Sequence, residues 1–100
     1  MQTLEKGQTK KIVVKFYDED DVLVDPEIGT AHITIYFQDS TTYLATTDLT
    51  KTVTGTYHYY WTTLNTDSVG IYLIEITATF GTHTHVNREQ VYVTDLIMGD

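Results

Sequence analysis

Nucleophilic catalysis is the first chemistry to consider, and the sequence offers few groups for it. The chain has no cysteine, and its serines are Ser40 and Ser68. Both lie in turn-like sequence, and neither sits in the G-x-S-x-G elbow that would present a nucleophile above a sheet. We therefore expect a protein that is not an enzyme.

A pair of histidines, His83 and His85, suggests a metal site. Residues i and i+2 of a strand point to the same face, so both imidazoles could converge on one ion, with His32 and His58 as further candidate ligands. Zinc, however, takes three or four well-placed ligands. The segment HTH also suits the end of a hairpin with both rings in water, and we favour that interpretation.

An acidic run offers oxygen ligands for calcium, from Asp18, Glu19, Asp20, Asp21 and Asp25. Calcium binds six to eight oxygens in a closed loop, and the EF-hand spacing with its central glycine is absent. A solvated hairpin turn accounts for the same residues. We therefore expect no metal and no cofactor in this protein.

The charge of the chain bears on its partners. The formal net charge is −8, and the chain has only six basic residues. Phosphate recognition needs clustered Lys or Arg, and the small cluster of Lys10, Lys11 and Lys15 reads as a solvated strand face. We expect neither nucleic acid nor an anionic membrane as a partner.

The start of the chain indicates where the protein is made. Polar sequence follows Met1 directly, without the apolar region of a secretory signal, and no run of 18 apolar residues occurs. Taking Met1 as the natural start, we expect a protein that is made and kept in the cytoplasm of its host cell.

Alternation of apolar and polar residues with a period of two runs through most of the chain, and it predicts strands that are buried on one face. No helical periodicity extends over three turns. Turn-like sequence recurs every 8–12 residues, as in two-layer β proteins. We predict one all-β domain over 1–100, an antiparallel sandwich of seven to eight strands with its core at about 10–94. The expected strands are 11–17, 22–24, 30–38, 42–46, 49–54, 56–63, 71–80 and 83–94.

The same alternation predicts which side chains form the core. In segment 42–46, Tyr43 and Ala45 are expected to point inward, and in the last strand Val93 should join Val91. The main predicted core consists of Val14, Phe16, Ile33, Ile35, Tyr59, Trp61, Tyr72, Ile74, Ile76 and Val91.

Tyrosines that alternate out of the core supply the candidate interaction residues. A tyrosine has an apolar ring, a polar tip and few rotatable bonds, which suits a protein or carbohydrate contact. We predict Tyr17, Tyr36, Tyr60 and Tyr92 as surface contacts, although cross-strand packing on a solvated sheet explains them equally well. An apolar segment near the end of the sequence, Leu96, Ile97 and Met98, is a further candidate.

Three local patterns carry a resemblance to known domains. Segment 67–72, DSVGIY, resembles the tyrosine corner of immunoglobulin-like domains, in which the hydroxyl of the tyrosine, here Tyr72, bonds to upstream backbone. Segment 55–61, GTYHYYW, resembles a strand of macroglobulin-like and bacterial immunoglobulin-like modules. Segment 16–26, FYDEDDVLVDP, is similar to a turn of those modules, with Asp21 where glycine is usual.

The resemblance spans about two thirds of the chain, over 11–80, and implies an immunoglobulin-like antiparallel β-sandwich. Freestanding domains of this kind are familiar as small virion proteins of tailed bacteriophages and related archaeal viruses. It therefore implies a virion structural protein that decorates or cements a capsid, or joins head to tail. Its partners would be other virion proteins, with a homo-oligomer within the particle as a possibility. A surface adhesion or carbohydrate-binding module is the alternative.

Overall fold

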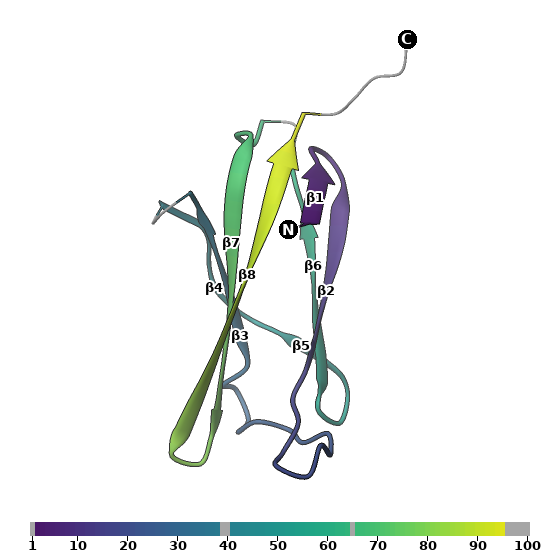
Figure 1. Ribbon diagram of the computed structural model, residues 1–100, viewed down its shortest axis with the longest axis vertical. Helices are drawn as coiled ribbons and strands as arrows, with labels where there is room; N and C mark the ends of the chain where they lie inside the picture. The colour runs from purple at the N-terminus through teal and green to yellow at the C-terminus, as the bar shows by residue number, and fades with distance from the viewer. Residues whose placement is uncertain (1, 39–40, 65, 96–100) are drawn as a thin grey trace.

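The computed structural model describes residues 2–38, 41–64 and 66–95, and it is built of strands and turns (Figure 1). Within those ranges no helix is long and apolar enough to cross a membrane. The strands are β1 (Gln2–Glu5), β2 (Thr9–Lys15), β3 (His32–Phe37), β4 (Thr41–Asp48), β5 (Thr50–Val53), β6 (Thr56–Thr62), β7 (Gly70–Phe80) and β8 (His83–Thr94). The predicted all-β class is confirmed.

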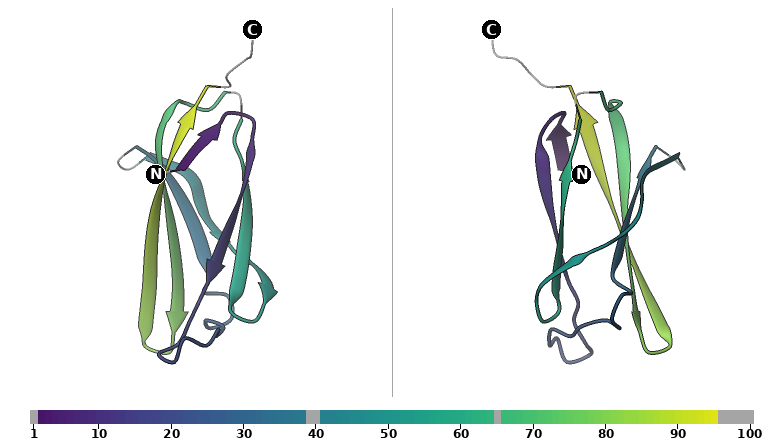
Figure 2. Two further views of the ribbon diagram at one scale, coloured as in Figure 1. Left: turned by 45° about the vertical axis from the view of Figure 1, so that its right-hand side comes forward. Right: turned by 180° about the vertical axis from the view of Figure 1, so that it is seen from behind.

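The strands form two sheets that face each other across the core (Figures 1 and 2). A five-stranded sheet has the order β1-β8-β7-β3-β4, and a three-stranded sheet has the order β2-β6-β5. The prediction of a wholly antiparallel fold is wrong at one pair, because β1 runs parallel to β8. The first and last strands of the chain therefore lie side by side. Between β1 and β2 the chain crosses to the other sheet, through a turn at Gly7 with a φ of 85°.

The core lies where the inward faces of the two sheets meet. Trp61 from β6 is 3% exposed, and Tyr72 from β7 is 1% exposed. The predicted core residues are buried, except that Val14 and Tyr59 are only partly buried and pack against the rest. Val93 is fully buried, as expected.

Three details of the strand prediction are wrong. Segment 22–24 is no strand but makes a single bridge, Leu23 to Tyr17. Ala45 is exposed, because register shifts along the β3–β4 pair break the alternation of β4. The core also begins earlier than position 10, because Leu4 of β1 is 8% exposed and belongs to it.

The tyrosine corner is present as predicted. The hydroxyl of Tyr72 donates to the carbonyl oxygen of Ser68 at 2.8 Å. The ring lies among Phe37, Tyr43 and Trp61, at centroid distances of 4.9, 5.0 and 5.5 Å. This aromatic cluster fixes the entry of the chain into β7 and joins the two sheets at the end where β7 begins.

Candidate functional site

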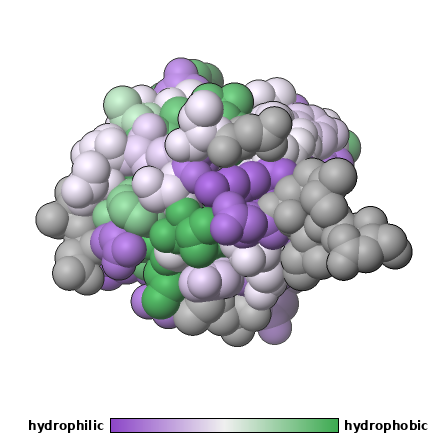
Figure 3. Space-filling model, turned by 90° about the horizontal axis from the view of Figure 1, so that it is seen from above, coloured by the Kyte–Doolittle hydropathy of each residue, from purple (hydrophilic) through white to green (hydrophobic). Residues whose placement is uncertain are grey.

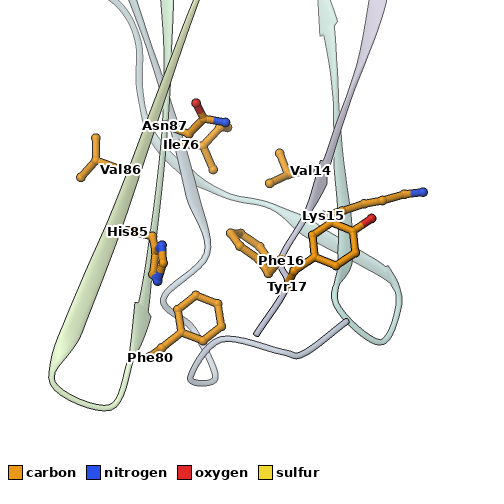
Figure 4. Close-up of a pocket in the computed structure, with 9 residues that line it drawn as sticks. All are labelled: Val14, Lys15, Phe16, Tyr17, Ile76, Phe80, His85, Val86 and Asn87. Carbon is orange, nitrogen blue, oxygen red and sulfur yellow. The ribbon is translucent and has the colours of Figure 1, made fainter. Parts of the chain in front are cut away.

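A groove between the two sheets, beside the first half of β8, is a partly enclosed and mainly apolar feature of the described surface (Figure 4). Its volume is about 250 Å³. Val14 comes from β2, Phe16 follows that strand directly, and Ile76 and Phe80 come from β7. Val86 of β8 points away from the groove in Figure 4.

The groove exists because the inward side chains of β8 change character along the strand. Val91 and Val93 are fully buried near its end. In the first half of the strand the corresponding positions, two residues apart, hold His85, Asn87 and Glu89, which are all exposed. Polar side chains do not close over an apolar layer. The sandwich therefore stays open along this half of β8.

Aromatic contacts shape the floor of the groove. Phe16, directly after β2, and Phe80 of β7 meet edge to face, with ring centroids 5.5 Å apart. The ring of His85 packs against Phe80 in the same manner at 5.0 Å. Edge-to-face pairs of this kind contribute about 0.5–1.5 kcal/mol beyond the burial of their area, so the floor is a fixed apolar surface.

A second, smaller hollow of about 120 Å³ continues the groove toward β1. It shares Val14, Lys15, Ile76 and Asn87 with the first, and Glu89 borders it as well. The two hollows adjoin each other and are both bordered by β2 and β8, and we call them together the interlayer groove. Its apolar floor and polar rim suit an extended segment of polypeptide.

The histidines considered as metal ligands lie on three different strands, with His83 and His85 on β8, His32 on β3 and His58 on β6. His83 and His85 are exposed, whereas His32 pairs with Asp48 at 3.0 Å and His58 contacts the hydroxyl of Thr52 at 2.6 Å. Among the described residues, no group of three or more His, Cys, Asp or Glu side chains could hold a metal ion.

The acidic segment forms the predicted turn. The carboxylate of Asp18 accepts the backbone N–H groups of Asp20 and Val22 at 2.8 and 3.0 Å. Asp21, the position at which the resemblance in sequence expects glycine, adopts a φ of 60°. Aspartate tolerates this left-handed conformation better than most residues do, so the turn forms without the glycine.

The carboxylate of Asp25 holds the neighbouring loop in place. It accepts bonds from the ammonium of Lys51 and the backbone N–H of Gly55, both at 2.7 Å. The hydrogen bond from Lys51, followed by that from Gly55, lowers the pKa of Asp25. Asp18 and Asp25 therefore both have roles in the packing of this end of the molecule.

The four predicted contact tyrosines do not share one face. Tyr60 is 55% exposed on the outer face of the three-stranded sheet, with the ammonium of Lys11 5.7 Å from its ring centroid. Tyr36 and Tyr92 lie on the outer face of the five-stranded sheet, on either side of β7. Tyr17 borders the interlayer groove.

Leu96, Ile97 and Met98, the other predicted contacts, lie outside the described residues. A further apolar surface is found at the end where β7 begins, in the loop between β6 and β7. There Leu64 is 57% exposed and Val69 is 37% exposed. Figure 3 looks onto this end and shows hydrophobic atoms gathered near its centre beside strongly hydrophilic ones.

Reasoning from the sequence missed the groove. Phe80 was expected only as the end of a strand, yet it forms part of the floor. The signal was present in segment 83–90, HTHVNREQ, where a strand covered on one face would have apolar residues at every second position. Polar residues at those positions indicate a strand that the core does not cover.

Comparison with known proteins gives no relative. No protein-family model matches the chain, and no curated protein and no solved structure matches it.

Proposed function

We propose that this chain is an immunoglobulin-like sandwich that serves, without catalysis, as a structural protein of a tailed-virus particle. It would decorate or cement the capsid, or act as a connector or tail accessory, through contacts with other virion proteins. The interlayer groove is the observation that carries the proposal, because it is an apolar, preformed surface suited to a polypeptide segment.

The immunoglobulin-like assignment is supported by the strand order. In immunoglobulin domains the second, fourth and fifth strands (B, D and E) share one sheet, while C, F and G form the other. The same division appears when β2, β5 and β6 are taken as B, D and E, and β3, β7 and β8 as C, F and G. The tyrosine corner at the start of β7, the equivalent of F, agrees with it.

A role without catalysis is supported by the lining of the groove. The described residues around its larger hollow are mainly apolar, with Lys15, Tyr17, His85 and Asn87 as the polar ones, so the groove offers apolar contact and rim hydrogen bonds. The net charge of the protein is −8, so we expect the surface around the contact to face solvent or a basic partner.

The test is whether the chain sediments with assembled particles. Particles from the source culture would be purified on a density gradient, and mass spectrometry would quantify the chain in each fraction. We expect it to peak with the major particle proteins at a constant ratio. Finding it only in particle-free fractions would contradict the proposal.

A matched pair of variants would test the groove. Asn87→Trp places a large ring at the groove, since Asn87 lines both hollows. Thr50→Trp places the same ring on β5, in the other sheet from β8, and both positions are exposed. We expect only Asn87→Trp to lower incorporation into particles.

Carbohydrate binding is the second candidate function, and the outer face of the three-stranded sheet favours it. Tyr60 is 55% exposed there, and the His58 ring lies 5.3 Å from it. An exposed ring with polar neighbours can stack on a sugar. Glycan binding that is lost in Tyr60→Ala but kept in Asn87→Trp would favour this function over the first.

A further inference from the structure

Strand β8 is paired on both sides over only part of its length. It has 12 residues, and β1 pairs with the last four, Val91 to Thr94. The first eight, His83 to Gln90, have β7 on one side and no strand on the other among the residues that the structure describes. All eight are exposed. We call this segment the open edge, and Figure 1 shows β1 beside only the far end of β8.

The hairpin fixes which backbone groups face the open side. Phe80 pairs with His83 across the two-residue loop Gly81-Thr82. Residues flanking such a loop exchange both hydrogen bonds, and the direction of the bonds then alternates along the strand. The N–H and C=O groups of Thr84, Val86, Arg88 and Gln90 therefore point away from β7. Thr94 has the same parity, and its carbonyl indeed accepts a bond from Lys6, next to β1, at 3.0 Å.

The other sheet edges carry features that discourage pairing with another chain. Lysines, short strands and bulges are the usual protections. β2 has Lys10, Lys11 and Lys15. β4 has register shifts in its pairing with β3, and β5 is four residues long with a register shift of its own.

The open edge has fewer of these protections, and its charged residues are Arg88 and Glu89. Its sequence, HTHVNREQ, has no lysine and no proline, and its register with β7 is continuous. Its formal charges, from Arg88 and Glu89, cancel. A second copy therefore meets little charge repulsion at this edge, although each chain carries −8 in total.

We propose that the open edge of β8 pairs antiparallel with the open edge of a second copy about a two-fold axis, joining the two five-stranded sheets into one. The inference deepens the proposed function by naming a partner, and it rests on that function only for the idea that the module works through protein contacts. A two-fold interface uses the same surface on both copies, as an open edge of this kind can.

The side chains favour a register with Val86 opposite Val86 of the second copy. Thr84 of each copy then lies opposite Arg88 of the other copy. The Val86 pair and the two Thr84–Arg88 pairs together make about six backbone hydrogen bonds, two per pair. On the groove side His83 lies opposite Glu89 of the second copy. A register shifted so that Arg88 meets Arg88 would place like charges directly opposite each other, which is destabilising.

Hydrogen exchange on the purified protein tests the pairing at the atoms that make it. At low concentration we expect the amides of Thr84, Val86 and Arg88 to exchange fast, while the amides between them are protected by β7. As concentration rises, those three amides should become protected and sedimentation should show a dimer. Fast exchange of the three amides at every concentration, or a monomer throughout, would overturn the inference.

A matched pair of variants shows whether this edge forms the dimer. Val86→Lys places two ammonium groups opposite each other in the proposed pairing, whereas Val53→Lys changes an exposed valine of β5, 58% exposed against 47% for Val86. We expect the first to weaken dimerisation at least about tenfold and the second to leave it unchanged. If the folded Val86→Lys variant dimerises as tightly as the wild type, the inference is also wrong. Since all these measurements use the isolated chain, their failure leaves the particle test of the proposed function standing.

Discussion

Gly55 and Gly29 both have positive φ values, 73° and 79°, but only Gly55 lies against another part of the chain. A Cβ added at Gly55 would come within 2.8 Å of both the Leu23 Cβ and the Val24 backbone nitrogen. At Gly29 the same atom would meet nothing within 4 Å. Alanine at the two sites therefore suffers similar backbone strain, and only one of the two substitutions adds a steric clash.

The magnitudes follow from these two contributions. A Cβ in the left-handed region costs about 1–2 kcal/mol, and the stiffer unfolded chain offsets about 0.4–1 kcal/mol of that. Gly29→Ala should then lower the free energy of unfolding by about 1 kcal/mol. Overpacking typically adds about 1–3 kcal/mol, so Gly55→Ala should cost about 2–4 kcal/mol. A domain of this size has only about 5–15 kcal/mol in total.

Urea denaturation of both variants and the wild type gives the comparison, provided that the dependence of free energy on urea is unchanged. The loop over Gly55 is also held by Asp25, which accepts the Gly55 N–H at 2.7 Å. The clash therefore cannot be relieved by moving the loop away without breaking that bond. If Gly55→Ala and Gly29→Ala lower the free energy of unfolding by the same amount within about 0.5 kcal/mol, the close packing of segment 23–25 on Gly55 is wrong.

Two further predictions concern the aromatic cluster. Tyr72→Phe removes the hydrogen bond to Ser68 and should lower the free energy of unfolding by about 1 kcal/mol; no change on urea denaturation would contradict the tyrosine corner. Burial, followed by the hydrogen bond to Asp67, raises the pKa of Tyr43 to about 12. Because the unfolded value is 10.0, the stability linked to the neutral phenol is complete below pH 10 and is lost as pH rises toward 12. Tyr43→Phe should flatten this loss, which unfolding measurements across that pH range would show.

Alternation in the sequence predicts the core because a strand that is buried on one face needs an apolar residue at every second position. Trp61, Tyr72 and Val91 are buried as their spacing indicates, and the tyrosine corner follows from a motif six residues long. Strand β1 escaped prediction because Leu4 is the one residue of that strand in the core. A strand so short is recognisable only through its parallel pairing with β8, some 90 positions away in the sequence.

The candidate site was harder to predict than the core for a related reason. Tyrosine spacing indicates that Tyr36 and Tyr60 point out of the core, but the division of strands between sheets decides that they lie on opposite outer faces. The groove likewise depends on how strands from the two sheets face each other, since both β2 and β8 border it. Local sequence carries only an indirect trace of it, in the polar inward positions of His85 and Asn87.

The β7–β8 hairpin is longer than the sheet that supports it, and this asymmetry connects the groove to the open edge. Pairing of β7 with β3 reaches only Thr77. Beyond that point β7 is held by a segment without strand structure, since the backbone N–H of Glu27 donates to the Thr79 carbonyl at 2.8 Å and the Thr79 N–H donates to the Thr30 hydroxyl at 3.2 Å. No equivalent support reaches β8 among the described residues, where Val86 is 47% exposed. A two-stranded hairpin is only marginally stable by itself in water. A strand added along β8, from whichever partner, would therefore stabilise the part of the fold that the chain itself leaves supported on one side.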